Sequence, residues 1–125
     1  MGPVESAVRS RCRSGDRLKT PTGRGEFSIA RIDETGVVLL LGAQEAWTPL
    51  SWSCLEGVPQ FLGRDQWVPI GSRFDSSADP QTLDGNLKGC LKRSTAGWVA
   101  VLLEHAGVVE IDRGRPARVR RVEPS

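Results

Sequence analysis

Residues 94–122, STAGWVAVLLEHAGVVEIDRGRPARVRRV, decide the fold, because a strong helix signal leads directly into a strong hairpin signal. Four apolar residues have the i, i+3, i+4, i+7 spacing of one buried helical face: Val99, Leu102, Leu103 and Ala106. Ser94 or Thr95 can cap this helix with a side-chain oxygen. Gly107 stands where a helix often ends on a left-handed residue. The stretch therefore predicts a helix that ends at Gly107.

A hairpin is predicted after this helix. Residues 108–111 are apolar enough for a strand, residues 112–116 have the composition of a turn, and residues 117–122 form the returning strand. The segment from Arg113 to Arg121 contains five arginines and no acid, although the whole chain has a net charge of only +2. This uneven distribution of charge favours an anionic partner for the hairpin.

A second helix is expected just before the first. Residues 82–91 carry leucines at i, i+4 and i+8, after an Asp-Pro pair that suits a helix start. Two helices joined by a short turn resemble a helix-turn-helix pair. Lys88, Lys92 and Arg93 would lie near that turn and could contact phosphates. Residues 71–125 are thus expected to form one helix-helix-hairpin subdomain.

The N-terminal half is expected to be a tail followed by a small sheet. Residues 1–15 are polar with scattered arginines and predict a flexible tail. Residues 16–70 hold short apolar runs separated by glycine-containing turns, which predicts a small antiparallel, SH3-like sheet. A short helix could follow at residues 53–62, although Gly57 and Pro59 argue against a regular one. The fold class is therefore α+β, with both halves sharing one core.

The order helix, glycine, apolar strand, basic turn, basic strand resembles the second half of a winged-helix DNA-binding domain. That resemblance implies a recognition helix preceded by Ser94 and Thr95, and a hairpin that acts as the wing. More weakly, Phe27, Gly36-Val37-Val38 and residues 98–103 (WVAVLL) resemble an accessory module at the N-terminal end of some bacterial restriction endonucleases. This second resemblance implies a DNA-associated role in bacterial regulation or defence, without a nuclease.

Residues 113–116, RGRP, match the core that AT-hook peptides insert into the minor groove. Glycine and proline give a narrow extended backbone, and arginines favour the negative potential of A·T tracts. Gly-Arg-Pro could equally just build the turn, with the arginines protecting an edge strand. The expected recognition helix offers small, nearly neutral residues, so contacts to phosphates should outweigh base reading. The residues expected to contact DNA are Arg113, Arg115, Arg118, Arg120 and Arg121, then Lys88, Lys92, Arg93, Ser94 and Thr95.

A catalytic site is not expected. The chain has one histidine, His105, whose place near a helix end suits a cap or packing role. No acid is followed two residues later by lysine, no phosphate-binding loop motif is present, and no ligand spacing predicts a metal or another cofactor. Three widely spaced cysteines without a CxxC pair suggest a reduced, cytoplasmic protein. No apolar run is long enough for a membrane span.

Two functions remain open from the sequence. The first is a non-enzymatic module that binds double-stranded DNA through the basic hairpin. The second is a protein–protein interaction module whose arginines meet an acidic partner. The five hairpin arginines favour DNA, whereas the modest net charge and the neutral recognition helix favour the protein partner.

Overall fold

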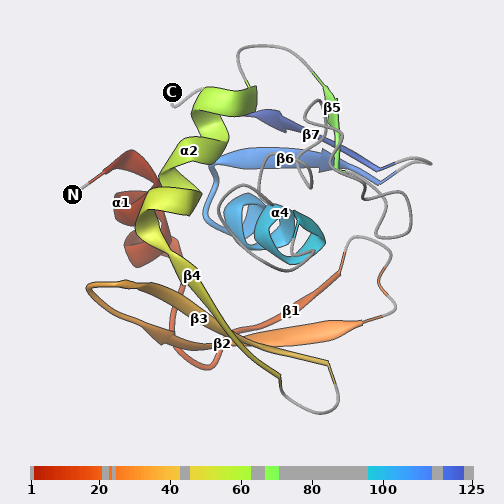
Figure 1. Cartoon of the computed structure of the whole chain (residues 1–125). Coiled ribbons are helices and arrows are strands. Elements are labelled where there is room, and N and C mark those ends of the chain that lie inside the picture. The colour runs from red at the N-terminus through yellow and green to blue at the C-terminus, as the bar shows by residue number, and fades with distance from the viewer. Residues whose placement is uncertain are drawn as a thin grey trace.

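The computed structural model describes residues 2–20, 23, 25–42, 46–62, 67–70, 96–113 and 117–122. The predicted helix at residues 82–91 and the predicted caps Ser94 and Thr95 lie outside these ranges. Within them the chain is mixed α+β, with two antiparallel sheets and three helices (Figure 1). The predicted fold class is confirmed at this level.

The N-terminal sheet is a four-stranded meander, as the turn pattern predicts. Its strands lie in the order β1 (Arg17–Lys19), β2 (Glu26–Ile32), β3 (Gly36–Leu41) and β4 (Ala46–Ser51), each antiparallel to the next. Gly36 starts β3 at a close approach of two strands, because a Cβ there would lie 1.9 Å from the carbonyl oxygen of Leu50. Only glycine fits at this position without a backbone shift.

The apolar strand β3 is covered on both faces, as its composition predicts. Val37 and Leu39 are completely buried on the inner face. On the outer face Val38 is only 4% exposed, between Arg31 of β2 and Pro49 of β4 in the strand register. Strand β3 therefore fixes the centre of the sheet against the core.

The prediction of a flexible tail over residues 1–15 is wrong for its first part. Residues Pro3–Arg11 form the helix α1, which buries Val4 and Val8 on one face. These two residues have the i, i+4 spacing that places side chains on the same side of a helix. Pro3 suits the first helical turn, where its missing N–H costs nothing. Burial of this short apolar stripe, rather than helix propensity, explains why the segment is ordered.

The start of α1 is capped by a residue far away in the sequence. The Glu56 carboxylate accepts hydrogen bonds from the backbone N–H groups of Val4 and Glu5, at 3.0 and 2.9 Å. These donors have no partner within the helix itself. The carboxylate lies so close to Gly2 that a Cβ at residue 2 would clash with it. Glu56 therefore ties α1 to the helix that carries it.

Helix α2 (Trp52–Leu62) begins where β4 ends and is more regular than the sequence suggests. Gly57 and Pro59 lie inside it. Five buried side chains line the helix and outweigh these two weak helix formers: Trp52, Cys54, Leu55, Val58 and Leu62. Cys54 is disulfide-bonded, whereas Cys12 is a buried free thiol. The expectation of a fully reduced chain is thus wrong at Cys54.

A second, three-stranded sheet follows in the order β5 (Val68–Pro69), β7 (Arg118–Arg121), β6 (Val109–Asp112). The predicted hairpin is confirmed, with β6 and β7 antiparallel and Ile111 opposite Val119. Gly107 has the predicted left-handed backbone, with φ +79°. Strand β5 lies far from the hairpin in the sequence, and it pairs with β7.

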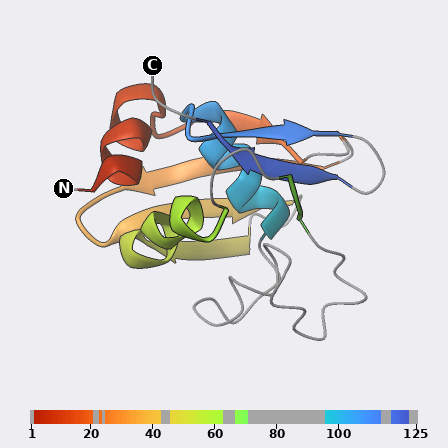
Figure 2. The same cartoon turned by 90° about the horizontal axis from the view of Figure 1, so that it is seen from above.

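Helix α4 (Ala96–His105) lies between the two sheets (Figures 1 and 2). It packs on β6 on one side and on β1 and α1 on the other. Its completely buried residues Val99, Leu102 and Leu103 belong to one hydrophobic cluster, which also includes Leu39 and Val119 from the two sheets. Both halves of the chain thus contribute to one core, with α4 at its centre.

Candidate nucleic-acid interface

The β6–β7 register brings two of the predicted arginines to one face of the second sheet. Arg118 and Arg120 alternate with Val119, which is completely buried, so both arginines face away from the core. Glu110 and Asp112 lie directly opposite on β6, on the same outer face. Arg118 pairs with Asp112 at 2.6 Å, and Arg120 forms an ion pair with Glu110.

A tryptophan from the segment before β5 completes this face. The half-buried Trp67 immediately precedes β5, and its ring centroid lies 5.8 Å from the Arg118 guanidinium and 4.7 Å from that of Arg120. Such distances are typical of cation–π contacts. We call these five residues the arginine face: Trp67, Glu110, Asp112, Arg118 and Arg120.

The other described hairpin arginines lie apart from this face. Arg121 is opposite the buried Val109, on the inner side of the sheet, where it is half-buried and has interactions of its own. Arg113 follows β6 and donates two hydrogen bonds to the Glu104 carboxylate of α4, at 2.9 and 2.5 Å. These bonds lower the pKa of Glu104 and raise the pKa of Arg113. Every described hairpin arginine therefore has a partner within the molecule.

An open groove lies beside Arg113, between β1 and the C-terminal half of α4. Its volume is about 810 Å³, and its lining combines cations with apolar residues: Arg17, Leu18, Lys19, Val101, His105 and Arg113. His105 lies at the end of α4, with its Nε2 3.4 Å from a carboxylate oxygen of Asp16. We call this feature the β1 groove.

Several predicted contact residues fall outside the described chain. These are Arg115, Lys88, Lys92, Arg93, Ser94 and Thr95. The helix expected to read DNA is described, and its surroundings correct that expectation. Ala100 is 1% exposed, and residues from Val99 to Leu103 are buried all round the helix. A helix that is apolar all round serves as a core element, so α4 offers no free face to a major groove.

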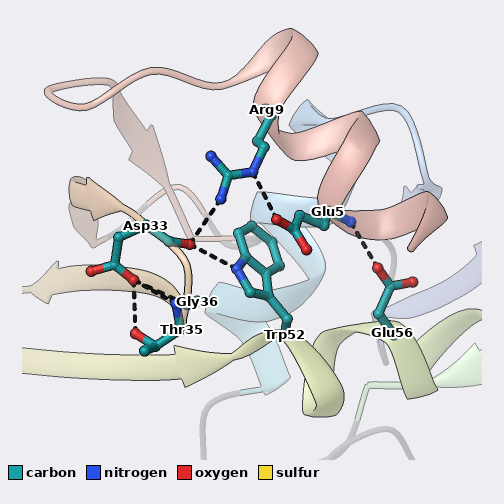
Figure 3. Close-up of polar contacts among 7 residues, drawn as sticks. All are labelled: Glu5, Arg9, Asp33, Thr35, Gly36, Trp52 and Glu56. Carbon is teal, nitrogen blue, oxygen red and sulfur yellow. Dashed lines mark hydrogen bonds and ion pairs between the residues drawn. The ribbon is translucent and has the colours of Figure 1, made fainter. Parts of the chain in front are cut away.

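A separate polar cluster joins α1 to the first sheet (Figure 3). The backbone carbonyl of Asp33 accepts hydrogen bonds from Arg9 at 3.0 Å and from the Trp52 indole at 2.8 Å. The Asp33 carboxylate accepts three more, two from Thr35 and one from Gly36, and the bond from the Thr35 hydroxyl contributes most to lowering its pKa. We call these residues the Asp33 corner: Arg9, Asp33, Thr35, Gly36 and Trp52.

The Asp33 corner is an architectural feature rather than a binding site. Trp52 is 7% exposed, and Arg9 also pairs with Glu5 on its own helix. All of the hydrogen bonds are made inside the molecule, between the β2–β3 turn, α1 and the start of α2. The corner therefore holds three elements together.

Sequence reasoning found the hairpin but missed Trp67, Arg17 and Lys19. Arg17 and Lys19 alternate around Leu18 on a short strand, which is a signal for two cations on one side of an edge strand. Trp67 gave no such signal, because its neighbours on β7 are about fifty residues away in the sequence.

Comparison with protein-family models, with curated proteins and with solved structures finds no match to this chain. Among the described residues, no three His, Cys, Asp or Glu side chains gather in a way that could hold a metal ion. None of the helices in the described part of the chain is long and apolar enough to cross a bilayer.

Proposed function

We propose that this protein is a non-enzymatic module that binds double-stranded DNA through the arginine face and the adjoining hairpin turn. The observation that carries the proposal is the position of Trp67 against Arg118 and Arg120 on one outward sheet face. Arginine side chains contact DNA phosphates, and contacts of this kind bind without reading sequence. The RGRP turn at residues 113–116 would extend the contact into the minor groove.

The order of elements supports the winged-helix interpretation. Among the described elements, helix α2, strand β5, helix α4 and the hairpin β6–β7 come in this order along the chain, with β5 beside β7 in the sheet. The hairpin then takes the role of the wing. Because α4 is enclosed, the wing contributes the contacts that a recognition helix would otherwise make. The SH3-like sheet acts in this proposal as the support that covers α4.

The acids on β6 set the strength of binding. Arg118 and Arg120 form ion pairs with Asp112 and Glu110. A phosphate must therefore displace a carboxylate before it can bind either arginine. Exposed ion pairs contribute only about 0–1 kcal/mol each, so this displacement is feasible. If all five hairpin arginines engage, log affinity should fall with log salt with a slope of about −4 to −5.

The test is a salt titration of binding to random-sequence duplex DNA, for the wild type and for the variant with Arg113→Ala and Arg115→Ala. Two lost phosphate contacts should reduce the slope by about two and weaken binding to all sequences alike. If the pair reads groove width, A·T-rich duplexes should lose more affinity than G·C-rich ones. Absence of salt-dependent binding by the wild type would contradict the proposal.

The alternative is an acidic protein partner, and one observation favours it. Three hairpin arginines already sit against carboxylates, which is the geometry that aspartate and glutamate side chains of a partner would adopt. This alternative takes the place of DNA binding if duplex DNA does not bind at low ionic strength. An arginine face that binds acidic peptide but not duplex DNA would establish it.

A further inference from the structure

The cations of the described chain differ in whether they have partners. Arg113, Arg118 and Arg120 each form an ion pair, and Arg121 is also engaged. In contrast, Arg17 and Lys19 make no side-chain hydrogen bond or ion pair within the described residues. Both are exposed and belong to β1, which is an edge strand of the first sheet. Among the described residues, the cations beside the β1 groove that lack such a partner therefore belong to the N-terminal sheet rather than to the hairpin.

These two cations line the β1 groove rather than an open convex surface. The groove volume of about 810 Å³ is within the range of roughly 300–1,000 Å³ that is usual for ligand sites. Leu18 and Val101 are apolar residues of its described lining. Apolar, low-dielectric walls strengthen the field of the cations above them, because less water screens it.

Arg113 connects this groove to the proposed DNA-binding surface. Its guanidinium lines the groove and is held in place by both oxygens of Glu104. A bidentate pair of this kind fixes the plane of the guanidinium. Less side-chain entropy is therefore lost when a third group binds to the arginine. Three cationic residues from β1 and the hairpin thus line one groove, and Glu104 is the acidic residue of its described lining.

We infer that the β1 groove binds a phosphate group, and that the group belongs to the nucleic-acid backbone. The nucleic acid is favoured as the source because Arg113 is shared with the hairpin, so one strand could run from the groove to the arginine face. The choice of nucleic acid as the source of the phosphate rests on the proposed function. The phosphate chemistry itself rests on Arg17 and Lys19, which have no side-chain partner in the described part of the chain, and on their place in the lining of the groove.

The experiment compares the variant with Arg17→Ala and Lys19→Ala against Arg31→Ala as a control. Arg31 is an exposed arginine on the same sheet, stacked 5.5 Å from the Trp47 ring and outside the groove. The first measurement is the salt slope of duplex DNA binding. Two lost contacts should reduce the slope by about 1.8, and Arg31→Ala should leave it unchanged. When the salt concentration rises from about 50 to 200 mM, the double variant should therefore lose roughly tenfold less DNA affinity than the wild type loses.

The second measurement uses inorganic phosphate and the NMR signals of His105, the only histidine of the chain. Phosphate should shift these signals in the wild type and in Arg31→Ala, but not in the double variant. If phosphate gives this pattern while the DNA slope is unaffected by the double variant, the groove takes a free phosphate ligand and the nucleic-acid source is overturned.

The remaining outcomes separate the groove from the hairpin. If the wild type binds DNA and the double variant changes neither measurement, the groove inference is overturned and the hairpin proposal stands. If the wild type does not bind DNA but phosphate still shifts His105, the proposed function fails and the phosphate chemistry of the groove is supported.

Discussion

Among the arginine–tryptophan contacts of the described residues, those of the Asp33 corner and those of the arginine face differ in role because their surroundings differ. In the Asp33 corner, Arg9 lies 5.6 Å from the Trp52 ring, and both side chains donate to the same backbone carbonyl. On the arginine face, Arg118 and Arg120 lie over Trp67 and pair with partly exposed carboxylate side chains of the facing strand. The backbone acceptor cannot leave without unfolding a turn, whereas the carboxylates can be exchanged for another anion.

The largest predicted effect is a difference in stability between substitutions of the two tryptophans. Trp52→Ala should lower the free energy of unfolding by about 3–5 kcal/mol, because it opens a cavity and removes the indole donor at Asp33. Trp67→Ala should cost only about 1–2 kcal/mol, because the side chain is half-buried and leaves no enclosed space. Urea denaturation followed by circular dichroism gives both values. Equal losses would mean that the arginine face is also an architectural element.

A second prediction concerns the buried thiol of Cys12, directly after the last residue of α1. Burial raises the pKa of the Cys12 thiol to about 11 from the ordinary 9.0, and the negative charge of Asp16 adds to this effect. The folded protein therefore holds the thiol proton more tightly than the unfolded chain does. The stabilisation is complete below about pH 9 and is lost as the pH rises to about 11, with a total of about 2–3 kcal/mol.

The measurement is the free energy of unfolding of the wild type and of Cys12→Ala between pH 8 and about pH 11. The wild type should lose about 2–3 kcal/mol more than the variant over this interval. Parallel curves for the two proteins would show that Cys12 can ionise without cost, and that charge is tolerated beneath α1 as it is on the arginine face.

The elements that could be predicted are those whose signals lie close together in the sequence. Helix α4, the turn at Gly107 and the β6–β7 hairpin follow from the apolar spacing and one glycine. The ion pairs of the arginine face could also have been predicted. Strand alternation across a short turn places Glu110 and Asp112 on the same side as Arg120 and Arg118. The count of five arginines overstated the positive charge available on the hairpin, because it left out the carboxylates of the facing strand β6.

The parts that could not be predicted depend on residues far apart in the chain. Helix α1 is capped by Glu56, and nothing near Val4 in the sequence reveals that carboxylate. Helix α2 forms in spite of Pro59 because the core supplies partners for five of its side chains. Burial of α4 between two sheets also depends on the whole fold, so its sequence alone could suggest an exposed recognition helix.

The most direct test of the central claim removes one carboxylate that pairs with an arginine of the arginine face and one that pairs with an arginine of the Asp33 corner. Glu110→Gln and Glu5→Gln each remove one negative charge, the first from Arg120 on the arginine face and the second from Arg9 in α1. Duplex DNA affinity is measured for both variants at one low salt concentration. Glu110→Gln should raise the affinity by about two- to fivefold, the equivalent of an exposed ion pair of roughly 0.4–1 kcal/mol. Glu5→Gln should leave it unchanged. An equal rise in both variants, or no rise with Glu110→Gln, would contradict the claim that Arg120 leaves its carboxylate for a DNA phosphate.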